Sequence, residues 1–454
     1  MPSYLTRIAA LNGVSATEFA QDMGLTLKKI INLEEDAVRA LSECGGLTDI
    51  QTKELISWTG QNVGDFRMVF RNEIFVSRAL RNPIIRGCPV CLREDAETDP
   101  SRPLAQMAIR GDWQLRELNV CVAHRHLLVP LWEYKQPTVR FEFSQRLTEI
   151  LSDILEGRLE QPRVLLSPYD LWLTRRLETG ADHTWLADKS LYAATTFCKL
   201  LGTEAQRLHF PAHAAVATSG HASGFDIARH GEARIRNTLN ALAAQANGHN
   251  DEPNKAFGQI YVDLSQAHLN KDDFAPFRKI LRDCIVDIWP VAAGENVLGL
   301  TQNERQLHSI TSAAHESKIG TFLLEQFLIH AGAITPDDDR PASRRTFDAR
   351  AYAGLLAEIP ALVGPKQMRQ QMGATRRQLA SLAEDKVLRP RIDIATIKLP
   401  WRVSDGLALV AELQELASSI DPSDERWEGI QQAKSRSGLR VGFIIAAIRA
   451  QQLQ

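Results

Sequence analysis

The sequence predicts a mainly α, multi-domain fold that combines helical domains, helix–turn–helix-like units and one small module built around cysteines. Three observations predict it. A chain of 454 residues is long enough for about two to four domains. Apolar residues recur at three- and four-residue steps through most of the chain, which is the period of an amphipathic helix. Two short cysteine-containing motifs interrupt that pattern between residues 81 and 135.

The composition is that of an ordinary globular protein, and it limits the possible partners. The 53 Lys and Arg residues and 55 Asp and Glu residues leave a net charge of −2, which excludes a uniformly basic surface. Any contact with nucleic acid must therefore come from local patches. The chain shows neither a run of about 18 apolar residues nor the apolar core of a signal peptide, so we expect a cytoplasmic protein without membrane spans.

Four residues with matched spacing predict a metal site: Cys88, Cys91, Cys121 and His124. Each pair has a two-residue spacer, so each can supply two ligands from one turn. Zn²⁺ prefers four such thiolate and imidazole ligands in a tetrahedron, and a filled set is typical of a structural site rather than a catalytic one. The alternatives are a redox C-x-x-C motif, unrelated buried thiols, and His126 in place of His124.

Residues 1–80 are predicted to form a helical, helix–turn–helix-like part. Ser15–Glu18 and Thr48–Gln51 have the pattern of capping boxes, in which side chains at a helix start satisfy free backbone groups. Residues 7–25 have the proportions of a helix–turn–helix, and the alternative is a helical hairpin that packs in the core.

Three further segments complete the predicted organisation. Residues 81–135 are expected to form a zinc-ribbon-like, zinc-binding module, with a short strand at 113–115. Residues 136–336 read as a helical domain that ends in a helix–turn–helix-like unit. The polar segment 337–344, DDDRPASR, is the best linker candidate. It opens a basic C-terminal region, 337–454, with tandem helix–turn–helix-like units.

A weak internal repeat supports these units. Residues 312–334, 368–388 and 430–453 each show a first helix, a short turn and an apolar second helix. In the middle copy, Arg376 and Arg377 follow a capping Thr375, at the helix start where recognition helices meet DNA.

Charge points to the same region. Residues 340–402 contain 13 Lys and Arg and five Asp and Glu, and 13 − 5 gives a local net charge of +8. A basic patch favours DNA contact, and the alternative is an ordinary helical face with solvated arginines. The candidate DNA-binding residues are Lys366, Arg369, Arg376, Arg377, Arg389 and Arg391.

The N-terminal motifs resemble those of the TniQ family, which together with TnsD-type proteins selects targets for bacterial transposons. The resemblance covers about residues 3–150 and rests on CPVCLRED, GDW and CVAHRHLL, with LTRIAALNGVSATEFAQDMGL and LTDIQTKELISWTG upstream. It implies an adaptor that recognises a target site or a target-bound complex and recruits an AAA+ ATPase and a transposase. Some relatives form dimers and dock on a CRISPR effector complex with its guide RNA, whereas others bind DNA directly.

The sequence favours a protein that is not itself an enzyme. It has no phosphate-binding loop of the G-x-x-x-x-G-K type, so any ATPase is expected to be a partner. Two alternatives remain. One is a zinc-containing helix–turn–helix transcription regulator. The other is a zinc hydrolase, which would need an open metal position and a general base such as Glu94. The target sequence, the oligomeric state and the use of guide RNA are left open.

Overall fold

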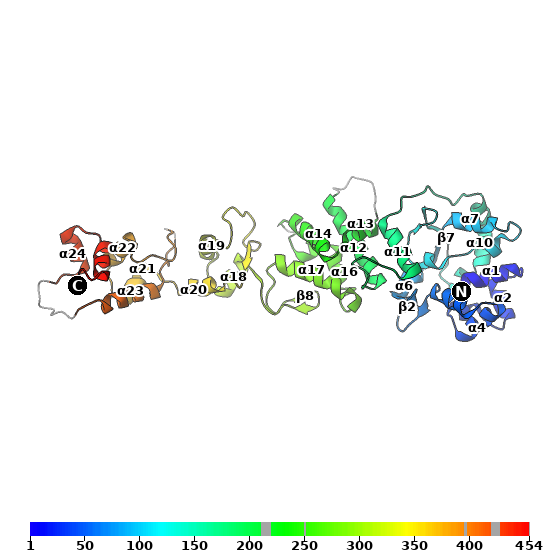
Figure 1. The fold of residues 1–454 in the computed structure, drawn as a ribbon, viewed down its shortest axis with the longest axis horizontal. Coiled ribbons are helices and arrows are strands. Elements are labelled where there is room, and N and C mark those ends of the chain that lie inside the picture. Colours follow the sequence, from blue (N-terminus) through cyan, green and yellow to red (C-terminus); the bar gives the residue numbers. More distant parts are fainter. Residues whose placement is uncertain (210–218, 249–250, 395–396, 419–426, 454) are drawn as a thin grey trace. The chain divides into compact units, whose positions relative to one another are not determined.

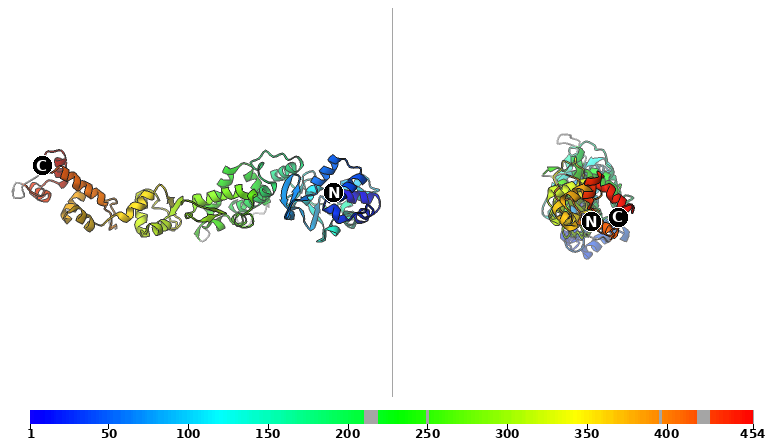
Figure 2. Two further views of the ribbon diagram at one scale, coloured as in Figure 1. Left: turned by 90° about the horizontal axis from the view of Figure 1, so that it is seen from below. Right: turned by 90° about the vertical axis from the view of Figure 1, so that its left-hand side faces the viewer.

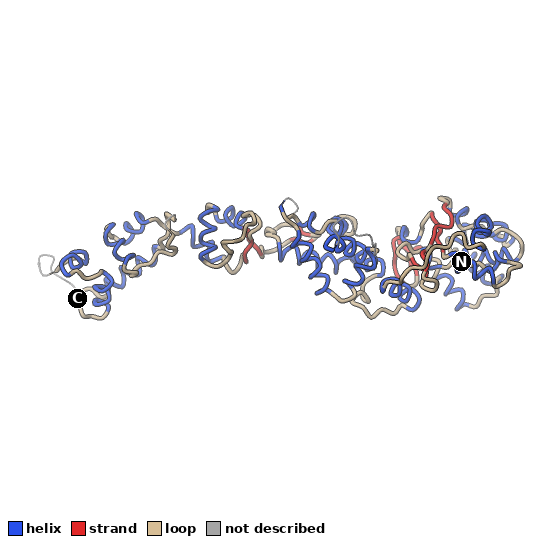
Figure 3. Tube along the Cα trace, turned by 90° about the horizontal axis from the view of Figure 1, so that it is seen from above, coloured by secondary structure: helices blue, strands red, loops and turns tan. Residues whose placement is uncertain are grey.

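The computed structural model describes residues 1–209, 219–248, 251–394, 397–418 and 427–453. The chain divides into two compact units, Met1–Cys284 and Ile285–Gln454 (Figure 1). In the described residues, strands form only small sheets of two or three, and helices make up most of the regular structure (Figure 3). This confirms the predicted mainly α class. None of the described helices is both long enough and apolar enough to cross a membrane.

The first unit begins with five short helices around one apolar core. Gly13, Gly24, Leu33 and Gly46 take a left-handed conformation between successive helices, which turns the chain back on itself. Leu5, Phe19, Ile30 and Leu41 are among the buried side chains of this core. The five helices are α1 (Pro2–Leu11), α2 (Ala16–Asp22), α3 (Leu27–Ile31), α4 (Glu35–Cys44) and α5 (Asp49–Ser57).

Both capping boxes predicted in this part are present. The Ser15 hydroxyl accepts a hydrogen bond from the Glu18 N–H at the start of α2, and the Glu18 carboxylate accepts one from the Ser15 N–H. Thr48 and Gln51 make the same pair of bonds at the start of α5. Residues 7–25 form the end of α1, a turn and α2, and the two helices pack in the common core.

A three-stranded antiparallel sheet follows the helices. Its strands are β1 (Gln61–Asn62), β2 (Arg67–Phe70) and β3 (Glu73–Val76), in the order 1-2-3, and α6 (Ser77–Leu80) follows β3. Phe70 and Phe75 are fully buried and meet edge to face, with ring centroids 6.1 Å apart. Alternate residues of β2 and β3 therefore point into the core of the unit.

The metal-ligand candidates lie between two paired strands. β4 (Ile84–Gly87) pairs antiparallel with β7 (Val129–Glu133), so the chain leaves this sheet and returns to it. Within that excursion lie α7 (Pro89–Glu97), α8 (Pro103–Gln106) and the hairpin of β5 (Val120–Cys121) and β6 (His126–Leu127). We call this segment, residues 84–133, the metal module.

The strand predicted at 113–115 is wrong. Gly111–Gln114 is a 3-10 helix, in which the Trp113 N–H bonds to the Arg110 carbonyl and the Leu115 N–H to the Asp112 carbonyl. Trp113 packs directly on Gly87, where a Cβ atom would lie 2.9 Å from the indole ring. Two apolar residues separated by one polar residue fit both a strand and a tight turn over a core, so the alternation did not distinguish them.

The rest of the first unit is helical, as its apolar period predicts. Gly202 and Gly224 let two of these helices, α12 and α13, cross with their backbones in contact, because a Cβ at either position would overlap main-chain atoms of the other helix. The helices are α9 (Pro137–Arg140), α10 (Phe143–Leu155), α11 (Pro168–Thr179), α12 (Leu191–His209), α13 (Gly220–Ala228), α14 (Glu232–Gln245), α15 (Pro253–Ala256), α16 (Gln259–Ser265), η3 (Asp272–Phe274) and α17 (Ala275–Ile288).

A buried ion network joins this helical part to the small sheet. Arg176 on α11 donates to Glu73 of β3 at 2.7 Å and to Asp182 at 2.9 Å. It also donates to the carbonyls of Leu186 and Lys189. The Arg176 and Asp182 side chains are only 5% and 2% exposed. The guanidinium therefore has partners for most of its N–H groups, as a charge in the interior requires.

The second unit contains the three predicted repeats (Figure 2). Each is a helix of eight residues, a turn of three and a second helix of nine or ten, which confirms the repeat. Lys318, Gly373 and Gly438 end the three first helices in the same left-handed conformation. The pairs are α18 (Ile310–Ser317) with α19 (Thr321–His330), α21 (Pro365–Met372) with α22 (Arg376–Glu384), and α24 (Ile430–Ser437) with α25 (Val441–Arg449).

The remaining elements of this unit connect the repeats. The last two share a core in which Met368, Leu382 and Ile445 are buried, and α23 packs against it through Leu409. The connecting elements are β8 (Asn296–Val297), β9 (Leu300–Thr301), β10 (Leu307–Ser309), β11 (Thr346–Asp348), α20 (Ala353–Glu358), η4 (Ile359–Ala361) and α23 (Val403–Glu415).

The boundary between the compact units lies at Cys284/Ile285 and not at the predicted linker 337–344. That segment is a loop within the second unit. β10 and β11 pair across it, and the carbonyls of Ala342 and Arg345 accept hydrogen bonds from the first residues of α18. A polar loop closed by strand pairing has the same composition as a linker. Only contacts between residues distant in sequence distinguish the two, so the composition of 337–344 did not.

Candidate metal centre

The four predicted ligands come from two turns of the metal module. Cys88 is the N-cap of α7, and Pro89 begins that helix with the φ that a first helical residue needs. Cys91 lies in the first turn of the same helix. Cys121 ends β5, and His124 lies in the turn to β6, which closes through Arg125 at a φ of 50°. One ligand atom from each residue falls within 4.8 Å of the others.

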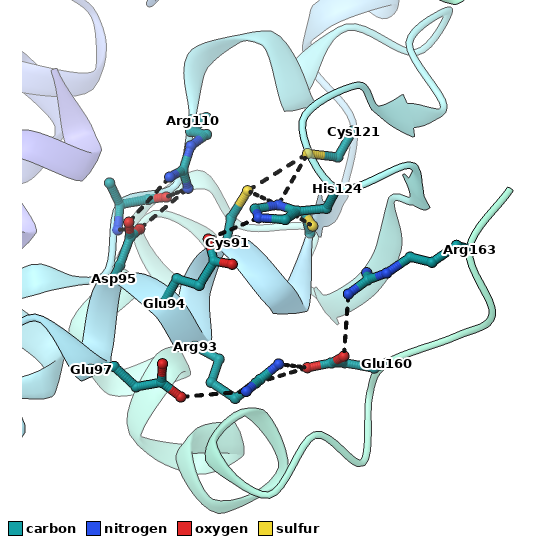
Figure 4. Close-up of polar contacts among 12 residues, drawn as sticks. Cys91, Arg93, Glu94, Asp95, Glu97, Arg110, Cys121, His124, Glu160 and Arg163 are labelled. Atoms are coloured by element: carbon teal, nitrogen blue, oxygen red, sulfur yellow. Dashed lines mark hydrogen bonds and ion pairs between the residues drawn. The ribbon is translucent and has the colours of Figure 1, made fainter. Parts of the chain in front are cut away.

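The distances within this group fit a tetrahedral metal site. Sγ of Cys91 lies 3.6 Å from Sγ of Cys121, and Nδ1 of His124 lies 3.7 Å from the sulfurs of both Cys88 and Cys121. The fourth distance, from Nδ1 of His124 to Sγ of Cys91, is shorter than the others at 3.1 Å. With metal–sulfur bonds of about 2.3 Å and metal–nitrogen bonds of about 2.0 Å, tetrahedral donors lie about 3.5–3.8 Å apart. Figure 4 shows Cys91, Cys121 and His124 pointing toward one another.

The burial of the group favours a bound cation. Without a cation, ionisation of one thiol opposes ionisation of the other two. Hydrogen bonds from Cys88 and Cys91 lower the pKa of the Cys121 thiol far below its usual range. The bond to Cys121 in turn raises the pKa of Cys88 to about 11, and it raises the pKa of Cys91 as well. A cation at the centre would stabilise all three thiolates, and the four residues form a cluster that could hold one.

Two residues that the ligand spacing did not identify support the cluster from outside. Glu94, one helical turn after Cys91, places a carboxylate oxygen 2.8 Å from Nε2 of His124 (Figure 4). Asp95 binds Arg110 through both oxygens and accepts the Ala108 N–H, so it ties α7 to the following loop. A carboxylate on the outer nitrogen of a ligating histidine orients the ring and raises its basicity.

The position of Glu94 also bears on the hydrolase alternative. A general base would have to face an open coordination position. Glu94 instead lies on the side of the imidazole opposite Nδ1, which is the atom that faces the sulfurs. Its three-residue spacing from Cys91 could have indicated that role, because residues three apart share a helix face.

His126 does not replace His124. It is fully buried, and its Nε2 accepts a hydrogen bond of 2.7 Å from the Gln161 N–H. Its Nδ1 lies within hydrogen-bond distance of the Leu127 carbonyl. Both ring nitrogens are therefore engaged away from the cysteines, and the structure brings His124 into the cluster, as the matched spacing favours.

The candidate DNA-binding residues lie in the second unit and do not all share one environment. Arg376 and Arg377 occupy the first turn of α22 and are exposed. Lys366 and Arg369 lie on α21, the first helix of the same pair. Among the described residues, none of these four side chains forms an ion pair. The capping box of Thr375 and Gln378 fixes the start of α22, as predicted.

The other two candidates lie beyond this pair. Arg389 is exposed in the loop after α22. Arg391 instead pairs with Glu358 at 3.2 Å, and Glu358 also binds Arg402. The structure thus gives Arg391 a role in joining α20 to the loop before α23.

The first unit offers a poorer DNA-reading helix. The start of α2 is covered by Glu142, a buried carboxylate that accepts hydrogen bonds from the Ala16 N–H, the Thr17 N–H and the Thr17 hydroxyl at 2.7, 2.9 and 2.6 Å. A recognition helix usually presents that end to base edges. The contact favours the core-packed hairpin over a DNA-reading unit at residues 7–25.

A comparison with known families identifies the N-terminal part of the first unit. Residues 1–128 match the model of the TniQ family. The matched segment runs from α1 through the β5–β6 hairpin and contains all four candidate ligands. No curated protein matches the chain. A TniQ domain implies a role in the selection of targets for transposition, with DNA and the transposition machinery as partners. Residues 1–128 are therefore similar to the TniQ domain.

Proposed function

We propose that this protein is an adaptor for target selection in DNA transposition. It recognises a target site, or a complex already bound there, and recruits the AAA+ ATPase and the transposase without a catalytic activity of its own. The observation that carries the proposal is the match of residues 1–128 to the TniQ family, which includes the complete Cys₃His cluster. The ATPase is assigned to a partner because the chain has no G-x-x-x-x-G-K loop.

The cluster is proposed to hold one structural Zn²⁺. Three sulfurs and one imidazole nitrogen are a donor set that zinc prefers, and together they fill a tetrahedron. Cys88, Cys91 and Cys121 are buried, and Glu94 holds the outer nitrogen of His124. Such a site would supply folding free energy to the metal module, because it ties the start of α7 to the β5–β6 hairpin.

Direct contact with DNA is assigned to the helix pair α21–α22 in the second unit. Lys366, Arg376 and Arg377 are exposed and form no ion pair within the described residues, and residues 340–402 carry a net charge of +8; both observations support that assignment. Duplex DNA attracts such cations because binding releases counterions from the phosphates. The covered start of α2 argues against the same role for the first unit.

The proposal is tested with the zinc-loaded full-length protein, the DNA flanking its transposon, and the AAA+ ATPase and transposase encoded beside it. An adaptor is expected to protect one DNA site from nuclease, or to bind a complex on that site, and to retain the ATPase there in a pull-down. Insertions near that site should depend on the protein. The proposal fails if the ATPase is not retained and the insertion pattern is unchanged when the protein is omitted.

The three helix–turn–helix units favour one second candidate, a zinc-containing transcription regulator. The same experiment separates the two. A regulator would protect a promoter site equally well with or without the ATPase, and it would change transcript levels but not the positions of insertions.

A further inference from the structure

A cavity of about 590 Å³ lies within the first unit, between the N-terminal helices and the metal module. Residues of α1, α3 and α5 contribute to its lining, as do residues of the 3-10 helix Gly111–Gln114, α6 and α9. Its size is within the range of pockets that bind a drug-sized molecule or a few side chains of a peptide. Neither the metal cluster nor the proposed DNA-binding helices contribute to its lining.

Two neighbouring arginines of the lining, Arg140 and Arg81, form a basic end of the cavity and have no ion-pair partner among the described residues. Arg140 is 6% exposed, its Nε has no hydrogen-bond partner among the described residues, and its other contacts are to the carbonyls of Tyr134 and Lys135. Burial and the positive charge of Arg81 lower the pKa of Arg140, and no carboxylate offsets them. Arg81 is exposed at the same lining, and among the described residues its side chain donates to the amide oxygen of Asn62.

The acidic groups of the cavity have other neighbours. Asp112 is largely buried, and its pKa is raised to about 6 by burial, with Glu178 and Arg110 among the charged groups around it. Neither carboxylate forms an ion pair with Arg140 or Arg81 in the described part of the chain. A buried guanidinium without a counterion is costly, so the basic end is complementary to an anion that the described part of the chain does not provide.

Apolar side chains also line the cavity. Trp58, Ile85, Trp113 and Phe141 are among them, and Arg140 stacks on Phe141 with its guanidinium carbon 5.0 Å from the ring centroid. A ligand that fits must therefore present an apolar group beside its negative charge. The phosphates of duplex DNA cannot reach a guanidinium that is buried in this way, whereas a side chain of an extended peptide can.

We propose that this cavity binds an acidic peptide segment of a partner protein, with a carboxylate at Arg140 and Arg81 and an apolar side chain against Trp58 and Phe141. Charge-assisted hydrogen bonds from arginine to a carboxylate would give the contact its orientation, and burial of the apolar group would give it affinity. The inference goes beyond the proposed target selection and does not depend on DNA recognition by the second unit, since the whole cavity lies in the first.

The test uses the full-length, zinc-loaded protein and a phage-displayed library of random dodecapeptides. Selected peptides are expected to combine Asp or Glu with Leu, Ile, Phe or Trp. Their fluorescein-labelled versions are then titrated by fluorescence anisotropy. Arg140→Gln and Arg81→Gln should each weaken binding about tenfold, as the loss of one charge-assisted hydrogen bond implies. Replacement of the acidic residues of the peptide by Asn or Gln should have a similar effect.

Two controls keep the result interpretable. Arg39→Gln removes an exposed arginine of α4 that does not line the cavity, and binding should stay within about twofold of the wild-type value. Arg81→Gln changes an exposed side chain, so it remains informative if Arg140→Gln fails to fold. The proposal is overturned if the library yields no enriched peptides, if enriched peptides lack acids, or if both cavity variants bind as well as Arg39→Gln. Adaptor function can be lost while this binding persists, so the two proposals fail separately.

Discussion

The metal module and the helix pair α21–α22 use polar side chains in opposite ways. In the module, cysteine, histidine and carboxylate side chains converge on one another and are mostly buried. In the helix pair, Lys366, Arg376 and Arg377 are exposed and have no carboxylate partner in the described residues, while a small apolar core holds the helices together. The polar side chains of the metal module thus bind one another, whereas those of the helix pair can bind another molecule.

This difference separates stability from recognition. A donor set that fills its own coordination sphere has nothing left with which to bind a target. Exposed arginines at a helix start contribute little to stability, yet they can neutralise phosphates or contact base edges. Changes in the metal module should therefore affect folding, and changes in the helix pair should affect DNA binding alone.

The largest effect is expected from loss of a ligand. Cys88→Ser should abolish metal binding and the cooperative unfolding of the first unit, because structural zinc contributes about 10–16 kcal/mol in small zinc-binding domains. Metal content and thermal unfolding by circular dichroism measure both effects. Cys44→Ser is the matched control, since Cys44 is exposed and lies outside the cluster. A folded, metal-free Cys88→Ser protein would show that the first unit does not need the metal in order to fold.

The next largest effect concerns the buried ion network of the first unit. Arg176→Ala leaves Glu73 and Asp182 without their counterion, which should destabilise the unit by about 3–5 kcal/mol. The comparable change in the second unit is Arg402→Ala, which breaks a more exposed pair with Glu358 and should cost less than about 1 kcal/mol. Urea unfolding of both variants checks the contrast, and equal losses would contradict it.

A smaller change is expected from the carboxylate behind the metal cluster. Glu94→Ala should weaken metal affinity about 10- to 100-fold while the four ligands remain, because the His124 ring loses the group that orients it. Competition with a chromogenic chelator gives the affinity. Glu97→Ala removes a carboxylate from the same helix that pairs with Arg93 instead, so it should leave the affinity unchanged. Equal effects of the two changes would remove Glu94 from the site.

The smallest effect on folding is expected from the two arginines at the start of α22, whose loss should instead weaken DNA binding. Arg376→Ala together with Arg377→Ala should reduce the slope of log affinity against log salt by about 1.8, at about 0.9 per lost phosphate contact. Thermal stability should stay the same, because both side chains are exposed and neither forms an ion pair with another described residue. Arg436→Ala is the control, because this arginine pairs with Glu428 and is not a candidate DNA-binding residue. An unchanged slope in the double variant would place DNA contact elsewhere.

The sequence predicted the features that depend on neighbours within a few residues. The ligand pairs, the capping boxes at Ser15, Thr48 and Thr375, and the helix–turn–helix repeat all belong to this class. Each requires particular residue types at fixed short spacings, because a turn or a helix start has a fixed geometry. The choice of His124 over His126 also followed from matched spacing.

The features that were missed depend on distant partners. Glu142 caps a helix 125 residues earlier, and Arg176 binds a carboxylate 103 residues away. The pairing of β10 with β11 turns an apparent linker into a loop, and the glycines of α12 and α13 allow a close helix crossing. Local composition does not indicate which distant residues come into contact in the fold, so the basic cavity could not be inferred from the sequence.

X-ray absorption at the zinc edge of the purified full-length protein tests the structural role of the cluster most directly. It should show one zinc per chain, bound by three sulfurs at about 2.3 Å and one nitrogen at about 2.0 Å, and these ligands should be unchanged when DNA is added. Fewer than three sulfurs, or an exchangeable water among the ligands, would contradict a closed structural site and reopen the case for metal-dependent chemistry.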